Sequence, residues 1–320
     1  MGRSILIVGN GIGLSLDPNY FKLQVALENV WNNTDHLSVK HKLLIQSAIE
    51  GTSDDTPPHS EEQLDKLQVA IIATEFLSGF EVGDASWVSE PAKELPTTFR
   101  KYIHEVALYF HNSGEKLPNS FVEPLSDFVN STKTHVATLN YDKLLYDALQ
   151  LTGVLDGFDG PLFDGFLSSG FDEKNLDRKN PDKHGWYMHL HGSPLYIENK
   201  KIMGKSRALI NPGDDSHIVL SSVEHKPIII GSSNILRVYW QRLEKAFEEG
   251  ERIILFGYSG LDTHLNDRIR LRKDDKKLLV VEWSGAGEEG ERKVFWQDKT
   301  GFEELELIHM DNILEFNGWS

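Results

Sequence analysis

The sequence predicts an α/β protein with a Rossmann-like, doubly wound parallel sheet that carries a helical insert. Short apolar runs rich in β-branched residues alternate with segments of helical periodicity, which is typical of parallel sheets. Four such runs are expected to be strands, at residues 4–8, 134–139, 252–256 and 278–282. Each run ends in a small or polar turn, and in such folds ligands bind at the carboxyl edge of the sheet.

The first strand, 4–8, leads into a glycine-rich turn at 9–13. Asp17 and Pro18 then indicate the start of a helix, because Asp is a good helix cap and proline suits the first helical position. Residues 20–130 are mostly helical in pattern, with breaks at stretches that contain proline, glycine and serine. We therefore expect a helical insert over 20–130 that packs beside the sheet.

The second half of the chain repeats the strand-turn-helix pattern. Residues 151–185 are rich in glycine, Asp and Asn and have little periodicity, as in loops that line pockets. Regular structure is expected to resume at 186–192. Further on, Asn234 is placed to cap a helix that Gly250 ends.

Composition excludes several classes of function. The 320 residues carry a net charge of −16, whereas surfaces that bind nucleic acid concentrate Lys and Arg. The chain has no cysteine, which excludes disulfides and Cys-ligated zinc. The apolar run at 4–8 meets glycine too early for a signal peptide or a membrane-spanning helix. A cytoplasmic protein that binds neither nucleic acid nor membrane is expected.

Four motifs lie at the expected strand ends: G-N-G-I-G at 9–13, T-L-N-Y-D at 138–142, L-H-G-S at 190–193 and F-G-Y-S-G-L-D at 256–262. Each is a weak signal alone, since glycines after a strand also form turns that bind nothing. In this order and spacing they resemble the sirtuin superfamily, and specifically the sirtuin-like proteins of bacterial antiphage systems, which lack the zinc module. The resemblance implies one NAD-binding catalytic domain over 1–320.

The resemblance also implies roles for individual residues. Asn140 matches the asparagine that contacts the nicotinamide ribose and positions water, and His191 matches the catalytic histidine. The early glycines match the phosphate loop, Gly257 and Ser259 match the turn that contacts the adenosine half, and Glu282 is placed to accept from ribose hydroxyls. The full set of expected cofactor-binding residues is Gly9, Asn10, Gly11, Gly13, Ser15, Asp142, Gly192, Gly257, Ser259, Asp262 and Glu282.

These residue types suit cleavage of the bond between nicotinamide and ribose. That step creates an oxocarbenium-like carbon, so the site needs a positioned water and a group that takes its proton. His191 suits the second task because imidazole titrates near neutral pH, and Asn140 can hold water without changing charge. The expected activity is hydrolysis of NAD to nicotinamide and ADP-ribose by a toxic antiphage effector, with NAD as substrate and no zinc. The implied partners are further copies of the chain or a separate sensor such as an ATPase.

Simpler interpretations of these residues remain open. Asn140 can merely cap the helix after it, and one of His189 and His191 can be a packed core histidine. Asp262 with His264 makes only a weak metal pair, because no third ligand accompanies it. Three aromatic residues at strand ends are interpreted as packing groups: Tyr141, Tyr258 and Trp283.

Two other functions are also open. One is a module that binds NAD or ADP-ribose as a regulatory ligand without hydrolysing it. The other is an enzyme that transfers ADP-ribose to, or deacylates, a macromolecule. True deacylating sirtuins carry a four-cysteine zinc module, which this chain cannot form.

Overall fold

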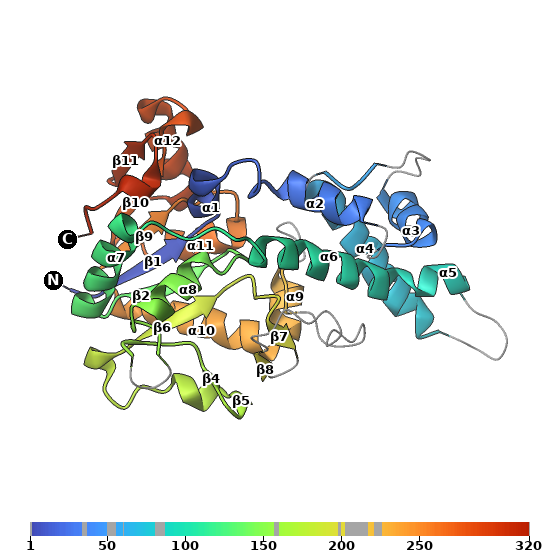
Figure 1. Cartoon of the computed structure of the whole chain (residues 1–320), viewed down its shortest axis with the longest axis horizontal. Coiled ribbons are helices and arrows are strands. Elements are labelled where there is room, and N and C mark those ends of the chain that lie inside the picture. The colour runs from blue at the N-terminus through green and yellow to red at the C-terminus, as the bar shows by residue number, and fades with distance from the viewer. Residues whose placement is uncertain are drawn as a thin grey trace.

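The computed structural model describes residues 2–33, 37–49, 56–59, 61–80, 87–156, 160–197, 200–201, 217–220 and 226–319. Within these ranges, seven strands form one parallel sheet in the order β11-β10-β9-β1-β2-β6-β3 (Figure 1). The strands are β1 (Ser4–Val8), β2 (His135–Thr138), β3 (Leu162–Phe163), β6 (Gly185–His189), β9 (Arg252–Phe256), β10 (Lys277–Trp283) and β11 (Glu306–Met310). The smaller antiparallel pairs are β4 (Phe166–Leu167) with β5 (Gly170–Phe171), and β7 (Tyr196–Ile197) with β8 (Lys200–Lys201).

Helices cover both faces of the sheet, which confirms the predicted doubly wound fold. Alternate residues of β1 show this directly, since Leu6 and Val8 pack in one apolar core and Ile5 and Ile7 in the other. The first core includes α1 (Gly11–Leu16), α7 (Asn119–Thr132) and α8 (Leu144–Leu151). The second includes α9 (Lys226–Ser232), α10 (Asn234–Glu249), α11 (Thr263–Arg270) and α12 (Glu289–Thr300). A strand buried on both faces explains the unbroken apolar runs in the sequence.

The helices that follow α1 extend away from the sheet as an arm (Figure 1). They are α2 (Leu23–Asn32), α3 (Val39–Ile49), α4 (Glu61–Ser78), α5 (Glu90–Lys93) and α6 (Leu95–His111). The described part of 20–130 thus forms these five helices and most of α7, which lies back on the sheet with Phe121 against Phe256.

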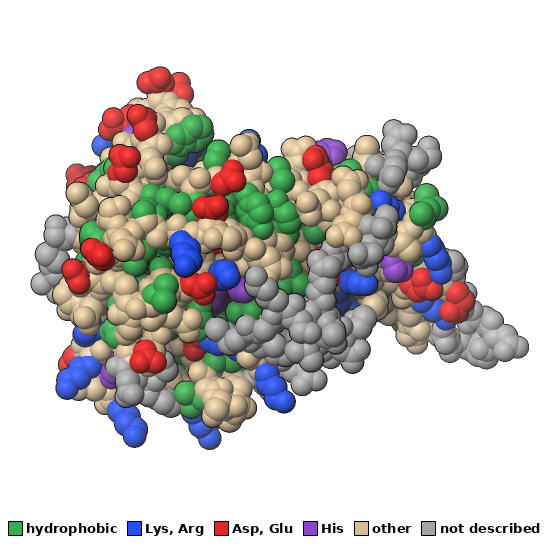
Figure 2. Space-filling model, viewed as in Figure 1, with side chains coloured by type: hydrophobic (Ala, Val, Ile, Leu, Met, Phe, Trp, Pro, Cys, Tyr) green, Lys and Arg blue, Asp and Glu red, His purple; other side chains and the backbone are tan. Residues whose placement is uncertain are grey.

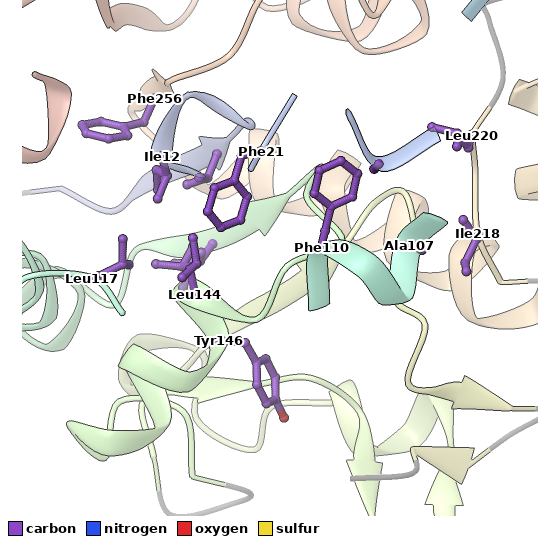
Figure 3. Packing of buried hydrophobic residues seen from close by; sticks show 14 of the residues in the cluster. Ile12, Phe21, Ala107, Phe110, Leu117, Leu144, Tyr146, Ile218, Leu220 and Phe256 are labelled. Atoms are coloured by element: carbon purple, nitrogen blue, oxygen red, sulfur yellow. The ribbon is translucent and has the colours of Figure 1, made fainter. Parts of the chain in front are cut away.

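The end of α6 joins the arm to the core near the sheet edge. The rings of Phe110 and Phe21 stack with centroids 6.4 Å apart, and Figure 3 shows them side by side. Ile218 and Leu220 pack in the same cluster, near Ala107 of α6 (Figure 3). The arm therefore contributes residues next to the carboxyl ends of the strands.

Two predicted helix starts are wrong. No helix begins at Asp17, because α1 starts directly at Gly11 and ends before Asp17. The Asp17 carboxylate instead accepts hydrogen bonds from the amides of Asn19 (2.8 Å) and Tyr20 (3.2 Å), which stabilises a turn. At α10 the cap is Ser233 and not Asn234, since the Ser233 hydroxyl accepts from the Leu236 amide at 3.2 Å.

Two strands of the seven-stranded sheet were not predicted, and both lie at its edges. β3 has only two residues and lies within the irregular region 151–185. β11 is half-buried along most of its length, so it lacks the continuous apolar run that marks the central strands. Four short 3-10 helices complete the described structure, at Glu173–Leu176, Pro181–Lys183, Ser284–Ala286 and Ile313–Glu315.

The surface carries charges of both signs. On the face in Figure 2, acidic side chains gather over α12 and β11, and basic ones lie along the lower edge near β4 and β5. None of the described helices has the length and apolar character needed to cross a membrane.

Candidate active site at the switch point of the sheet

A cavity of about 580 Å³ lies at the carboxyl edge of the sheet. After β1 the chain builds β2, β3 and β6 on one side, then returns to build β9, β10 and β11 on the other. Such a switch point is where open α/β sheets bind ligands, and this volume is ordinary for a small-molecule site. The cavity is lined by Gly9, Asn10, Gly11, Leu14, Leu23, Phe110, Leu139, Asn140, Tyr141, Asp142, His191, Val219, Leu220, Lys226, Gly257, Tyr258, Ser259, Leu261, Asp262, Glu282, Trp283, Ala286, Arg292, Phe295 and Ile313.

The glycine-rich turns after β1 and β9 contact each other through their backbones. The Gly11 amide donates to Gly257 O at 2.8 Å. A Cβ at Gly11 would lie 2.5 Å from Gly257 Cα, and one at Gly9 would lie 2.7 Å from Gly257 O. Gly257 itself has φ +58°, which favours glycine. Side chains cannot be accommodated there, so the floor of the cavity between the two strands is bare backbone.

Asn140 lies in the cavity and does not cap the helix that follows it. Its Nδ2 donates to Gly9 O at 3.1 Å, which ties the end of β2 to the glycine turn after β1. Among the described residues its Oδ1 has no hydrogen-bond partner. The α8 helix gets its local support from Asp142, whose carboxylate accepts from the Leu144 amide at 2.9 Å.

Asp142 is a buried carboxyl group at the same edge. Burial raises its pKa to about 6, and the hydrogen bond from the Leu144 amide only partly offsets this. A carboxyl group with a pKa near neutrality in a cavity is a common feature of ligand and catalytic sites, although structural groups show it too.

His191 is held by Asp262. The imidazole Nε2 lies 2.8 Å from Asp262 Oδ2, and Lys226 Nζ lies 3.1 Å from the same oxygen. Burial alone would raise the pKa of Asp262. The hydrogen bond from His191, the charge of the His191 ring when it is protonated and the charge of Lys226 outweigh burial and hold that pKa well below its ordinary range. Segments far apart in the chain thus meet in one charged cluster at the cavity wall.

His189 is the packed histidine of the pair. It lies in β6 among the rings of Tyr146, Tyr187 and Tyr196 and does not line the cavity. Burial lowers its pKa to about 3, so it is neutral at physiological pH. His189 is therefore the core histidine, and His191 is the one that lines the cavity.

Glu282 lines the cavity but already has four hydrogen bonds from the protein. Arg292 donates to both carboxylate oxygens (2.9 and 2.7 Å), Trp296 Nε1 donates to Oε2 (2.9 Å), and His309 Nε2 lies 2.7 Å from Oε1. Burial opposes ionisation of Glu282, yet these bonds keep its pKa below the ordinary value. Arg292 in turn lies over the Phe295 ring at 3.9 Å and also lines the cavity.

Three expected residues lie outside the cavity lining: Gly13, Ser15 and Gly192. A Cβ at Gly13 would lie 2.6 Å from Phe21 Cδ1, so this glycine lets a core ring pack. Gly192 has φ +83° and forms an isolated bridge with Ile218, and a Cβ there would lie 1.4 Å from His217 O. Gly192 therefore allows the 217–220 segment to lie beside His191, where Val219 donates to His191 O at 2.9 Å.

Several lining residues were not expected from the sequence. Lys226 precedes an apolar run and Arg292 lies within a charged helix, so neither had a motif to mark it. Tyr141, Tyr258 and Trp283 were interpreted as packing groups, and all three border the cavity. Tyr141 also donates its hydroxyl proton to Val219 O, which fastens the 217–220 segment over this region.

The weak metal pair finds no support in the described residues. The ring of His264 lies against Trp240 with centroids 4.6 Å apart, and its pKa is lowered by burial. Nowhere in the part of the chain that the structure describes do three or more His, Asp or Glu side chains gather as metal ligands would.

Comparison with known families agrees with this geometry. A family model described as a SIR2-like domain matches residues 134–300, just over half of the chain. The match includes Asn140, His191 and Asp262, and it supports a function related to NAD. No curated protein sequence matches the chain. The seven-stranded parallel fold, the cavity at its switch point and this match together place the chain in the SIR2-like domain family.

Proposed function

We propose that this chain binds NAD in the cavity and hydrolyses it to nicotinamide and ADP-ribose. The observation that carries the proposal is that Asn140 and His191, 51 positions apart, line one cavity together with the bare glycine turns. Membership of the SIR2-like family supports NAD as the ligand. The acidic net charge gives no support to a nucleic-acid substrate.

The lining suggests how the dinucleotide lies. Gly9, Gly11 and Gly257 leave backbone without side chains, which suits the close approach of a pyrophosphate. The adenosine half would then lie toward Ser259 and Arg292. The nicotinamide ribose would lie between Asn140 and His191, on the side where the lining is mainly apolar: Leu14, Leu23, Phe110, Tyr141 and Val219.

The proposed reaction breaks the bond between C1′ of the ribose and the ring nitrogen of nicotinamide. The bonding electron pair goes to the pyridinium ring, which leaves as neutral nicotinamide, and a water oxygen bonds to C1′. The water's proton passes to His191 and then to solvent. Asn140 Oδ1 is the acceptor that orients the water or a ribose hydroxyl, since its Nδ2 is engaged by Gly9 O. Orientation of this kind can supply several kcal/mol of the barrier reduction.

Hydrolysis is favoured over transfer to a macromolecule because the chain has no cysteine for the zinc module of deacylating sirtuins. We propose further that the activity is that of a toxic effector in antiphage defence. An enzyme that depletes NAD must be inactive until triggered, so control by assembly with further copies of the chain or by a separate sensor, such as an ATPase, belongs to the same proposal.

The test is to incubate the purified chain with NAD, alone and with the protein encoded beside it, and to measure nicotinamide and ADP-ribose. Equal amounts of both products are expected, with loss of both in His191→Ala. NAD labelled in the adenylate phosphate is added in parallel with a carrier protein and with an acyl-lysine peptide. Label in the carrier, or acylated ADP-ribose, would favour transfer instead. Bound but intact NAD would favour a regulatory binding module.

A further inference from the structure

The polar contacts of the cavity wall converge on one carboxylate oxygen. Asp262 Oδ2 accepts from His191 Nε2 at 2.8 Å and from Lys226 Nζ at 3.1 Å. The side chains are 4% exposed for Asp262, 6% for Lys226 and 11% for His191. Charge-assisted hydrogen bonds that are shielded from water in this way hold their groups more firmly than exposed pairs do.

The Asp262 carboxylate is itself fixed in place. Its second oxygen, Oδ1, accepts from the Leu265 amide at 3.1 Å as the cap of α11. The Asp262 amide donates to Tyr258 OH at 3.0 Å, and the same hydroxyl lies 2.9 Å from Asn266 Oδ1. Asn266 Nδ2 then donates to Gly260 O at 2.8 Å. This network leaves the carboxylate one orientation, with Oδ2 toward His191.

We propose that Asp262 and Lys226 are positioning residues for His191 in the NAD cleavage proposed above. Asp262 accepts the Nε2 proton and so fixes the orientation of the ring and its tautomer. In that tautomer Nδ1 is the nitrogen able to take a proton from the substrate or water. Lys226 supplies the counter-charge that allows Asp262 to stay ionised beside a neutral imidazole.

Lys226 has a distinct task because a buried carboxylate needs a cation. The Lys226 ammonium balances the negative charge of Asp262, so His191 can remain neutral and serve as a base. Without it, Asp262 would be compensated only by a protonated His191, which cannot accept a proton. The other titratable groups around this cluster are Asp142 after β2, His264 on α11, and the Glu282 and Arg292 pair, which all border the cavity or neighbour Asp262.

The variants that test this are Asp262→Asn, Lys226→Met and the double variant. Asn still caps α11 through its side-chain oxygen, so Asp262→Asn removes charge while the cap remains. We expect kcat to fall about 100-fold in Asp262→Asn, with KM changed less than about threefold, a loss within the range of general acid-base catalysis. In Lys226→Met we expect the acidic limb of the pH-rate profile to move to higher pH, and Lys226→Arg to restore the wild-type limb.

Because Lys226 acts through Asp262, the double variant should be no slower than Asp262→Asn alone. Additive losses would mean that Lys226 contacts the substrate by itself and would overturn its role here. The matched control is Lys201→Met, which removes the ammonium that contacts the comparably buried Asp164 outside the cavity. If Lys201→Met lowered kcat and shifted the acidic limb as Lys226→Met does, both effects would be due to general destabilisation and the role of Lys226 would be overturned.

A spectroscopic measurement separates this inference from the proposed function. In ¹⁵N-histidine-labelled protein, the signals of His191 are those lost in His191→Gln. We expect the Nε2–H tautomer in the wild type above pH 7 and a mixture of tautomers in Asp262→Asn. An Nδ1–H ring in the wild type, or an unchanged spectrum in Asp262→Asn, would overturn the inference. An Nε2–H ring in a chain that leaves NAD intact would overturn the proposed function while the positioning contact stood.

Discussion

Asn140 and Gly9 are joined by a hydrogen bond of 3.1 Å from the side-chain amide to the backbone carbonyl, across 131 positions of sequence. The bond places a polar amide at the switch point, where two strand ends meet. We predict that Asn140→Ala loses nicotinamide release by at least about 100-fold, since orientation of the reacting groups is lost. Loss of one hydrogen bond should lower the free energy of unfolding by only about 1 kcal/mol. Product assays and urea unfolding check both numbers, and near-normal release would exclude Asn140 from the reaction.

The contact between the two glycine turns leads to a second prediction. Gly11→Ala places a Cβ 2.5 Å from Gly257 Cα, and backbone cannot move aside as a flexible side chain can. We expect a loss of about 1–3 kcal/mol in the free energy of unfolding, as for other overpacked sites, and weaker NAD binding by calorimetry. Gly290→Ala is the matched control, because it lies within α12 and its Cβ would have no neighbour within 4 Å. The control should gain stability, by up to about 1 kcal/mol. Equal behaviour of the two variants would argue against the turn contact.

Two carboxyl groups of the site should respond to pH in opposite directions. The pKa of Asp142 is raised from 3.8 to about 6, so the folded state favours its protonated form and stability is lost as pH rises through this window. The full difference corresponds to about 3 kcal/mol. Asp142→Asn should therefore be more stable than the wild type above pH 6 and lose that advantage below pH 4. Urea unfolding between pH 4 and pH 8 measures this, and a pH-independent difference would contradict it.

Asp262→Asn is the matched comparison, because its pKa is lowered and each Asn keeps the bond to a backbone amide. Ionised Asp262 stabilises the fold above its unfolded pKa, and that stability is lost as pH falls toward the lowered folded value. Asp262→Asn should thus be less stable than the wild type at pH 7, by an amount that stays constant down to about pH 4 and shrinks as the pH falls further. If Asp142→Asn and Asp262→Asn changed the free energy of unfolding at pH 7 in the same direction, the opposite pKa shifts of the two carboxyl groups would not be the cause.

The buried carboxylate of Glu282 should contribute more to the free energy of unfolding than a carboxylate with similar partners at the surface. Glu282→Gln breaks the ion pair between the buried Glu282 carboxylate and the half-buried Arg292, and the loss of one partner of a buried pair costs about 3–5 kcal/mol. Glu244→Gln is the control, since Glu244 pairs with Arg268 and Arg272 but its side chain is 28% exposed against 5% for Glu282. Exposed pairs contribute about 1 kcal/mol or less. Thermal or urea unfolding ranks the two, and a larger loss in the control would reverse this account.

Much of the sheet could be predicted because parallel strands buried on both faces leave unbroken apolar runs. The same logic placed Gly9, Asn140, His191 and Asp262 at one edge, since the carboxyl ends of parallel strands meet there. Edge strand β11 was not predicted because most of its side chains are only half-buried, so the strand lacks a continuous apolar run. A helix start was wrongly predicted at Asp17 because Asp favours turns and helix caps for the same reason: its short side chain accepts hydrogen bonds from nearby amides.

The remainder of the site depends on tertiary contacts that no local pattern encodes. Lys226 reaches Asp262 across 36 positions, and nothing in its neighbourhood marks it. Gly192 has the correct motif position, yet its glycine is required by the 217–220 segment that packs on it. Arg292 is paired with Glu282 by the way α12 returns to the sheet. Residue type suggested chemistry in each case, but only the fold decided which groups face the cavity.

The most direct test of the central claim compares NAD binding and NAD cleavage in the wild type and in His191→Ala. Calorimetry gives the affinity, and chromatography of the same samples gives nicotinamide and ADP-ribose. If NAD lies between Asn140 and His191, the variant should bind NAD within a few-fold of the wild type and release nicotinamide at least about 100-fold more slowly. Wild-type protein that binds one NAD and returns it intact, or a variant that cleaves NAD at the wild-type rate, would contradict the account.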